Sequence, residues 1–89
     1  MTTHRSVEWT AATGLRRVDI EAKTTLIPVD VLADPELSLT AKGLYALLLA
    51  EQGRPVNPFD DAIESELEIA AAVNELTDAG LAVRVPQPR

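Results

Sequence analysis

Apolar residues recur at helical spacing near the middle of the chain and predict its longest helix, over residues 38–51. The stripe consists of Leu37, Ala41, Leu44 and Leu48 at i, i+4, i+7 and i+11, widened by Tyr45, Leu47 and Leu49. Ser38 can cap the free amides of the first turn, and Gln52-Gly53 suits a left-handed cap at the end. Inside the helix, Gly43 costs about 1 kcal/mol relative to alanine. Close packing at this glycine and simple tolerance of it are the two explanations.

Residues 57–80 predict two shorter helices separated by a tight turn, which is the outline of a helix-turn-helix. Asn57-Pro58 is a helix start, since the amide side chain accepts free N–H groups and the ring already has helical φ. The inward face of this first helix would be formed by Phe59, Ala62 and Ile63.

The second helix of this pair begins at a capping-box pattern formed by Ser65 and Glu68. Its apolar positions recur at i, i+4 and i+7, and Gly80 ends it. We expect the pair to be held to the long helix by Ile63, Ile69, Val73 and Leu76.

Alternating apolar and polar residues predict strands near both ends of the chain. Residues 7–10 alternate, Thr13-Gly14 supplies a turn, and residues 18–23 alternate again, which predicts a hairpin over residues 7–24. A two-stranded hairpin is marginal alone, so it must lie on helices or on a second subunit. Residues 81–85 predict a final strand, and residues 29–33, between two prolines, predict one helical turn.

The sequence of the central helix resembles that of winged helix-turn-helix domains in bacterial plasmid and phage replication proteins and in small bacterial regulators. The resemblance rests on Leu37-Ser38, Ala41 and Gly43-Leu44, and on the helix exit Leu76-Thr77-Asp78-Ala79-Gly80. It implies a mainly α fold with a small β component: a winged helix-turn-helix-like three-helix core over residues 25–85. We expect a flexible N-terminus at residues 1–6 and then the hairpin at residues 7–24. The domain follows, and a short C-terminal tail at residues 86–89 ends the chain.

The length and composition of the chain fit one small globular domain. Its 89 residues leave no room for a second core, and with one Trp, one Tyr and one Phe the core must be mainly aliphatic. The absence of cysteine excludes disulfides and thiolate metal sites and favours a cytoplasmic setting. We expect neither a signal peptide nor a membrane span.

Negative charge is concentrated where the resemblance would place DNA contacts. The net charge is −6, and residues 57–80 hold seven acids and no Lys or Arg. In DNA-binding members of the family, the resemblance implies that the second helix of the pair enters the major groove and that a hairpin wing contacts the backbone. Here only Asn74 on that helix suits a base edge, and nothing on it suits a phosphate. Four residues follow Val85, too few for a second wing strand.

Catalytic and metal-binding patterns are not found in the sequence. His4 is the sole histidine, and no nucleophile–base set or phosphate loop occurs, so we expect a non-enzymatic protein without cofactor or small-molecule substrate. On a helix, Asp60, Asp61 and Glu64 would share one face and could imitate a metal site. Acids that complement the helix dipole, on a solvated face, are the favoured explanation, and we predict no metal site.

Three functions compete at this stage. The first is a small regulator that works through protein–protein contacts, either as a dimer or by docking on a partner with a basic surface, such as the transcription machinery. Its candidate contact residues are Trp9, Asp60, Asp61, Glu64, Glu68 and Glu75. The second is direct DNA binding in transcription or replication, through Arg16, Arg17, Asn74 and Arg84. The third is an acidic decoy that blocks the DNA site of another protein.

Overall fold

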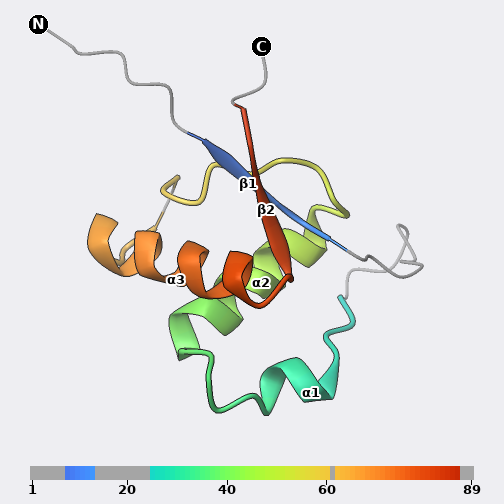
Figure 1. Ribbon diagram of the computed structural model, residues 1–89. Helices are drawn as coiled ribbons and strands as arrows, with labels where there is room; N and C mark the ends of the chain where they lie inside the picture. The colour runs from blue at the N-terminus through green and yellow to red at the C-terminus, as the bar shows by residue number, and fades with distance from the viewer. Residues whose placement is uncertain (1–7, 14–24, 61, 87–89) are drawn as a thin grey trace, which may run out of the picture.

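The computed structural model describes residues 8–13, 25–60 and 62–86. In these ranges the element order is β1 (Trp9–Ala12), α1 (Val29–Leu32), α2 (Leu39–Ala50), α3 (Glu66–Asp78) and β2 (Ala82–Val85). The strands lie on one side of α2 and α3, and α1 lies near the opposite side (Figure 1). The predicted mainly helical class with a small β component is confirmed, as is the single turn at residues 29–32.

Capping fixes the bounds of α2 as the sequence predicts. The Ser38 hydroxyl accepts the N–H of Ala41 at 3.1 Å, and left-handed Gln52 and Gly53 follow the last turn. The buried positions are Ala41, Leu44, Tyr45, Leu48 and Leu49.

One expectation about α2 is wrong, and the structure decides between the two explanations for Gly43. Leu47 is 62% exposed instead of widening the buried stripe, because residues 43, 47 and 50 share the face opposite the core. Gly43 lies on this outer face as well, and a Cβ added there would meet nothing within 4 Å. Close packing therefore does not explain Gly43, and simple tolerance does.

α3 begins and ends where its sequence signals predict. Ser65 and Glu68 form both halves of the capping box, each with a 3.1 Å hydrogen bond, and Gly80 takes φ 74° beyond the last turn. The core-facing positions Ile69, Val73 and Leu76 are all buried, as expected.

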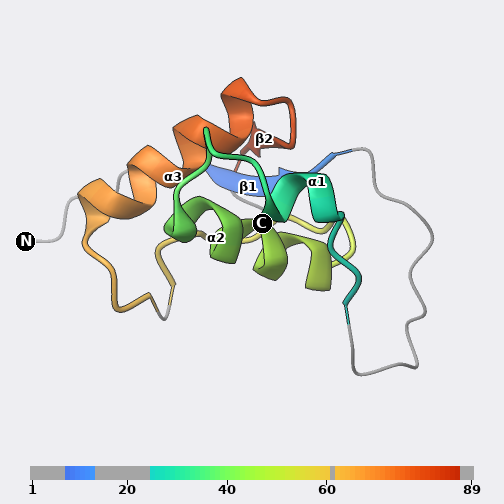
Figure 2. The same cartoon turned by 90° about the horizontal axis from the view of Figure 1, so that it is seen from below.

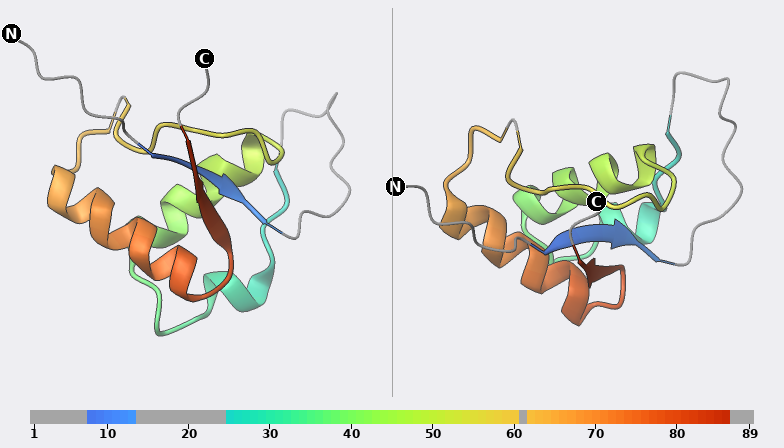
Figure 3. Two further views of the ribbon diagram at one scale, coloured as in Figure 1. Left: turned by 45° about the horizontal axis from the view of Figure 1, so that its top comes forward. Right: turned by 90° about the horizontal axis from the view of Figure 1, so that it is seen from above.

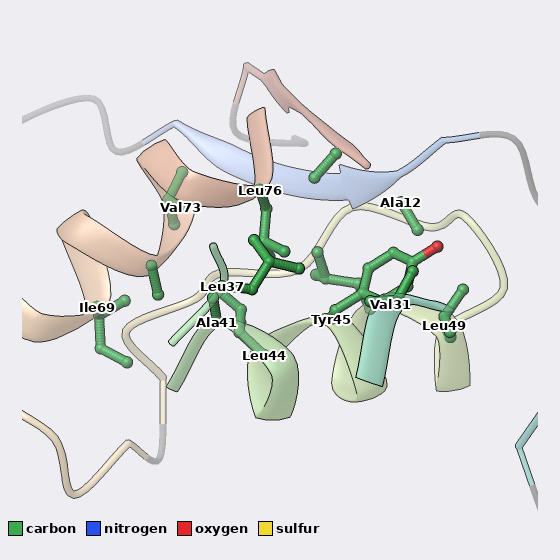
Figure 4. Packing of buried hydrophobic residues seen from close by; sticks show 13 residues of the cluster. Ala12, Val31, Leu37, Ala41, Leu44, Tyr45, Leu49, Ile69, Val73 and Leu76 are labelled. Carbon is green, nitrogen blue, oxygen red and sulfur yellow. The ribbon is translucent and has the colours of Figure 1, made fainter. Parts of the chain in front are cut away.

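The helices and the sheet enclose one aliphatic core. α2 and α3 pack against each other (Figure 2). Leu48 of α2 and Leu76 of α3 have no exposed surface. Val31 from α1 and Ala12 from β1 close the core from two other directions (Figure 4). Tyr45 is the one aromatic residue of this cluster.

β1 pairs with β2, at the far end of the chain. The strands are antiparallel, with Trp9 opposite Val85 and Ala12 opposite Ala82. On the other edge of β1, Thr10 and Val56 exchange two backbone hydrogen bonds of 2.8 Å, so Thr10 has neighbours on both sides. Figure 3 shows the segment that follows α2 running beside β1. Both edges of β1 at Thr10 are therefore occupied, by Val56 and by Arg84, and the hairpin predicted over residues 7–24 stays a prediction. Residues 18–23 themselves lie outside the described residues.

The first helix of the expected helix-turn-helix pair is not formed. Asn57 begins a single turn, in which its side chain accepts the N–H of Phe59 and its carbonyl accepts the N–H of Asp60, and no helix follows among the described residues up to 65. The expectation that Ile63 packs inward is also wrong, since its side chain is 96% exposed. Ser65 is extended to cap α3, so at most one or two turns fit before it, and short helices rarely persist without packing.

Candidate groove beside helix α3

A groove of about 610 Å³ lies between the first half of α3, the sheet and the turn at residues 57–59. We call it the α3 groove. Its apolar walls are formed by Pro58, Phe59, Leu67, Ala70 and Val73. Leu67 is 84% exposed, although leucine is usually buried. The groove therefore combines a concave shape with uncovered apolar surface.

The described residues between 57 and 64 form no helix beside α3. Leu67 and Ala70 lie on the outer side of α3, away from the core-facing stripe, and both are exposed. In Figure 1 the described residues just before α3 are drawn as a loop and not as a helix. No described residue covers Leu67.

Of the charged side chains that line the groove, one forms hydrogen bonds within the fold and two form no ion pair with a described residue. Arg84 donates to the Asn74 amide oxygen and, at 3.3 Å, to the Thr77 hydroxyl, so its guanidinium joins β2 to α3. The carboxylates of Glu8 and Glu66 form no ion pair with any described residue. Both are exposed and remain available to a cationic partner.

Thr10 also lines the groove and is 1% exposed, and its hydroxyl has no hydrogen-bond partner among the described residues. The indole N–H of Trp9 is likewise buried and without a partner in the described part of the chain. Because successive strand residues point to opposite faces, Trp9 lies on the sheet face that looks away from the groove. Trp9 is therefore not part of the same site as the acids of α3.

The acids proposed for protein contact fall into two groups. The Glu68 carboxylate completes the capping box, and Glu75 accepts two hydrogen bonds from Ser38, so both side chains act within the fold. Asp60 and Glu64 are exposed and form no ion pair with a described residue. Asp61 lies outside the described residues.

The residues proposed for DNA contact are only partly described. Arg84 and Asn74 are brought together, but as partners of each other, so the Asn74 amide oxygen is engaged by Arg84 and not presented alone. Arg16 and Arg17 lie outside the described residues. In the described ranges, no group of three acidic or histidine side chains is placed to hold a metal ion.

Sequence reasoning missed the groove because four separate segments form it, at residues 8–10, 57–59, 66–74 and 84. One signal was present: Leu67 stands off the stripe of Ile69, Val73 and Leu76, with Ala70 following on the same outer side. A large apolar residue on the outer side of an otherwise acidic helix indicates an uncovered face. No comparable signal indicated that Thr10 and Phe59 would line one groove, because this depends on the sheet topology.

The described part of the chain carries an uncompensated negative charge. It holds eleven acidic side chains against three basic ones, Lys42, Arg54 and Arg84. Its single ion pair joins Arg54 to Glu51 at 3.5 Å on the surface, three residues apart. Such exposed pairs contribute little to stability. Most of the carboxylates in the described ranges have no cation beside them, so the surface there is negatively charged.

No family model, no curated protein and no solved structure matches this chain. The winged helix-turn-helix resemblance therefore stays a prediction. Within the described residues, no helix has the length and apolar character that crossing a membrane requires.

Proposed function

We propose that this protein is a small non-enzymatic regulatory module that acts by docking on a partner protein with a basic surface. The observation that carries the proposal is the pairing of exposed apolar side chains on α3 with a surface of uncompensated carboxylates. Apolar contact supplies affinity, and complementary charge supplies speed of association and choice of partner.

The charged side chains of α3 favour a protein partner over DNA. DNA affinity comes mainly from cations that neutralise phosphates, and α3 contains two glutamates in its first turn and no Lys or Arg. Arg84, the one cation among the described residues that line the groove, is already engaged by Asn74 and Thr77. A duplex brought to this face would meet carboxylates.

Charge also favours a different protein over a second copy of this chain. Each copy carries a net charge of −6, and like-charged surfaces brought together cost several kcal/mol. A partner rich in Lys and Arg, such as a nucleic-acid-binding protein, reverses the sign of this interaction. The proposed partner is therefore a basic protein.

Two measurements on the full chain test the proposal. A mobility-shift assay at low salt with mixed-sequence duplex DNA should show no complex. Affinity capture from a nuclease-treated lysate should retain basic proteins, and their retention should weaken as salt rises, since screening shortens the reach of surface charge. A DNA shift at low salt, or capture that is indifferent to salt, would contradict the proposal.

A competition experiment separates docking from the decoy hypothesis. If a captured partner is a DNA-binding protein, DNA and this chain should compete for it only where the chain occupies the DNA site. Formation of a ternary complex would assign docking without decoy activity.

A further inference from the structure

We propose that the α3 groove binds a basic amphipathic helix of the partner protein, with the apolar face of that helix laid against Leu67, Ala70 and Phe59. This inference rests on the proposed function and specifies where and how docking occurs. It commits to one occupant chemistry: a helix with apolar residues on one side and Lys or Arg beside them.

The apolar walls of the groove match the apolar face of the proposed helix. Leu67 comes from α3 and Phe59 from the turn after Asn57, and Val73, which is buried on α3, also lines the groove. Ala70 is small and exposed, which lets the axis of a second helix approach to within about 8–10 Å of α3. Large apolar side chains from an incoming helix can then contact Leu67 and Phe59.

Exposed acids at the groove match the cations of the proposed helix. Glu66 on α3 and Glu8 before β1 line the groove on two different elements, and both are exposed without an ion pair to any described residue. Asp60, one residue beyond Phe59, adds a third exposed acid. Carboxylates from two elements beside apolar walls complement a helix whose apolar stripe is bordered by cations.

A helix fits better than an extended peptide at β1, one of the two strands that line the groove, because β1 has no free edge at Thr10. Both backbone groups of Thr10 bond to Val56, and β2 occupies the other side of β1. An extended peptide gains affinity by adding to a sheet edge, whereas a helix satisfies its own backbone and needs only side-chain contacts. The stretch from Glu66 to Asn74 measures about 12 Å, which matches roughly two turns of a partner helix.

The test uses a phage-displayed library of random peptides of about 16 residues, long enough for roughly four helical turns. Selection is carried out on the full chain. The enriched peptides should carry apolar residues at i, i+3 or i+4, and i+7, with Lys or Arg alongside. Circular dichroism should show that each selected peptide gains helical structure when it binds.

Matched variants then locate the binding site. Leu67→Ala should weaken the selected peptides about tenfold or more, whereas Leu39→Ala should leave them unchanged, because Leu39 is 86% exposed but lies outside the groove. Glu66→Gln should weaken binding about threefold and flatten its salt dependence, with Glu36→Gln as the control charge change. All four positions are exposed, so the fold should persist in each variant, which circular dichroism verifies.

Three results would overturn the inference: no enriched peptide, enriched peptides that are acidic or bind without becoming helical, or equal effects of Leu67→Ala and Leu39→Ala. Each would leave the proposed function standing if basic partners are still captured from lysate. A DNA complex at low salt would remove the proposed function whatever the peptides do, so the two failures can be told apart.

Discussion

Glu75 receives two hydrogen bonds from Ser38, which lies 37 residues earlier in the chain. The Ser38 backbone N–H donates to Oε1 at 2.6 Å, and its hydroxyl donates to Oε2 at 2.9 Å. The same hydroxyl accepts the N–H of Ala41 as the cap of α2. One serine therefore starts α2 and ties it to the second half of α3, and the carboxylate lies at the N-terminus of α2, where the helix dipole favours negative charge.

Removal of this carboxylate should destabilise the fold. We expect Glu75→Ala to lower the free energy of unfolding by about 1 kcal/mol, because a charge-assisted pair of hydrogen bonds is lost at an exposed position. A double-mutant cycle with Ser38→Ala, followed by urea denaturation, should show a coupling energy of about 1 kcal/mol. Glu36→Gln is the control, expected within about 0.5 kcal/mol of the parent. Additive effects at Ser38 and Glu75 would contradict the link.

The sequence predicted those features whose signals are local. Ser38, Ser65 with Glu68, and Gly80 each act within four residues of the helix end that they define, and all three ends occur as expected. The buried stripe of α3 followed from spacing alone, because one strongly periodic helix has one natural inward face.

The features that sequence reasoning missed depend on distant segments. The partner of β1 lies about 70 residues along the chain, and pairing with a nearby strand is the more common arrangement. The turn at Asn57 has the local signals of a helix start, but a helix of one or two turns needs packing to persist, and Ile63 has nothing to pack against. The α3 groove depends on distant segments as well, since residues of β1, β2, α3 and the turn at Asn57 line it together.

Two isoleucines near the start of α3 test the corrected fold directly. Ile63→Ala should change the free energy of unfolding by less than about 0.5 kcal/mol, because the side chain is already in solvent. Ile69→Ala should cost about 2–4 kcal/mol, because Ile69 is buried in the core. Urea denaturation of both variants provides the comparison. Similar costs at the two positions would instead favour the helix-turn-helix outline with Ile63 inside.

Two glycines should respond to the same substitution with opposite signs. Gly43→Ala should stabilise the protein by about 0.5–1 kcal/mol, since the site is helical and a Cβ has open space around it. Gly80→Ala should destabilise it by about 1 kcal/mol, because φ is 74° there and a Cβ disfavours left-handed backbone. Thermal unfolding should show a higher midpoint for the first variant and a lower one for the second. A loss of stability in Gly43→Ala would show that the face is covered.

The buried hydroxyl of Thr10 should be a source of instability. Thr10→Val keeps the β-branched shape, which suits a strand, and removes a hydroxyl without a partner among the described residues, so stability should rise by about 1 kcal/mol. Thr10→Ser keeps the hydroxyl, loses the methyl group and should lower stability by about 1 kcal/mol. If Thr10→Val proves the less stable of the two in urea, the hydroxyl has a bonding partner that stabilises the fold.

Tyr45 should ionise at unusually high pH. Burial raises its pKa above the ordinary value, and the negative charge of Asp30 raises it further. Tyr45 is the only tyrosine, so the ultraviolet absorbance of tyrosinate reports it alone. Asp30→Asn should lower this pKa without restoring the ordinary value, because burial is the larger cause. An unchanged titration curve would exclude the influence of Asp30.

The same shift predicts how stability depends on pH. A pKa that is higher in the folded chain than in the unfolded chain means that the folded state holds the phenol proton more tightly. The contribution of Tyr45 to stability is therefore complete below the unfolded pKa of about 10 and is lost as pH rises through the folded value. Urea denaturation across this range should show stability falling with pH in the parent and a flatter profile in Tyr45→Phe, whose buried ring cannot ionise. Equal slopes for the two proteins would assign the alkaline loss of stability to other groups.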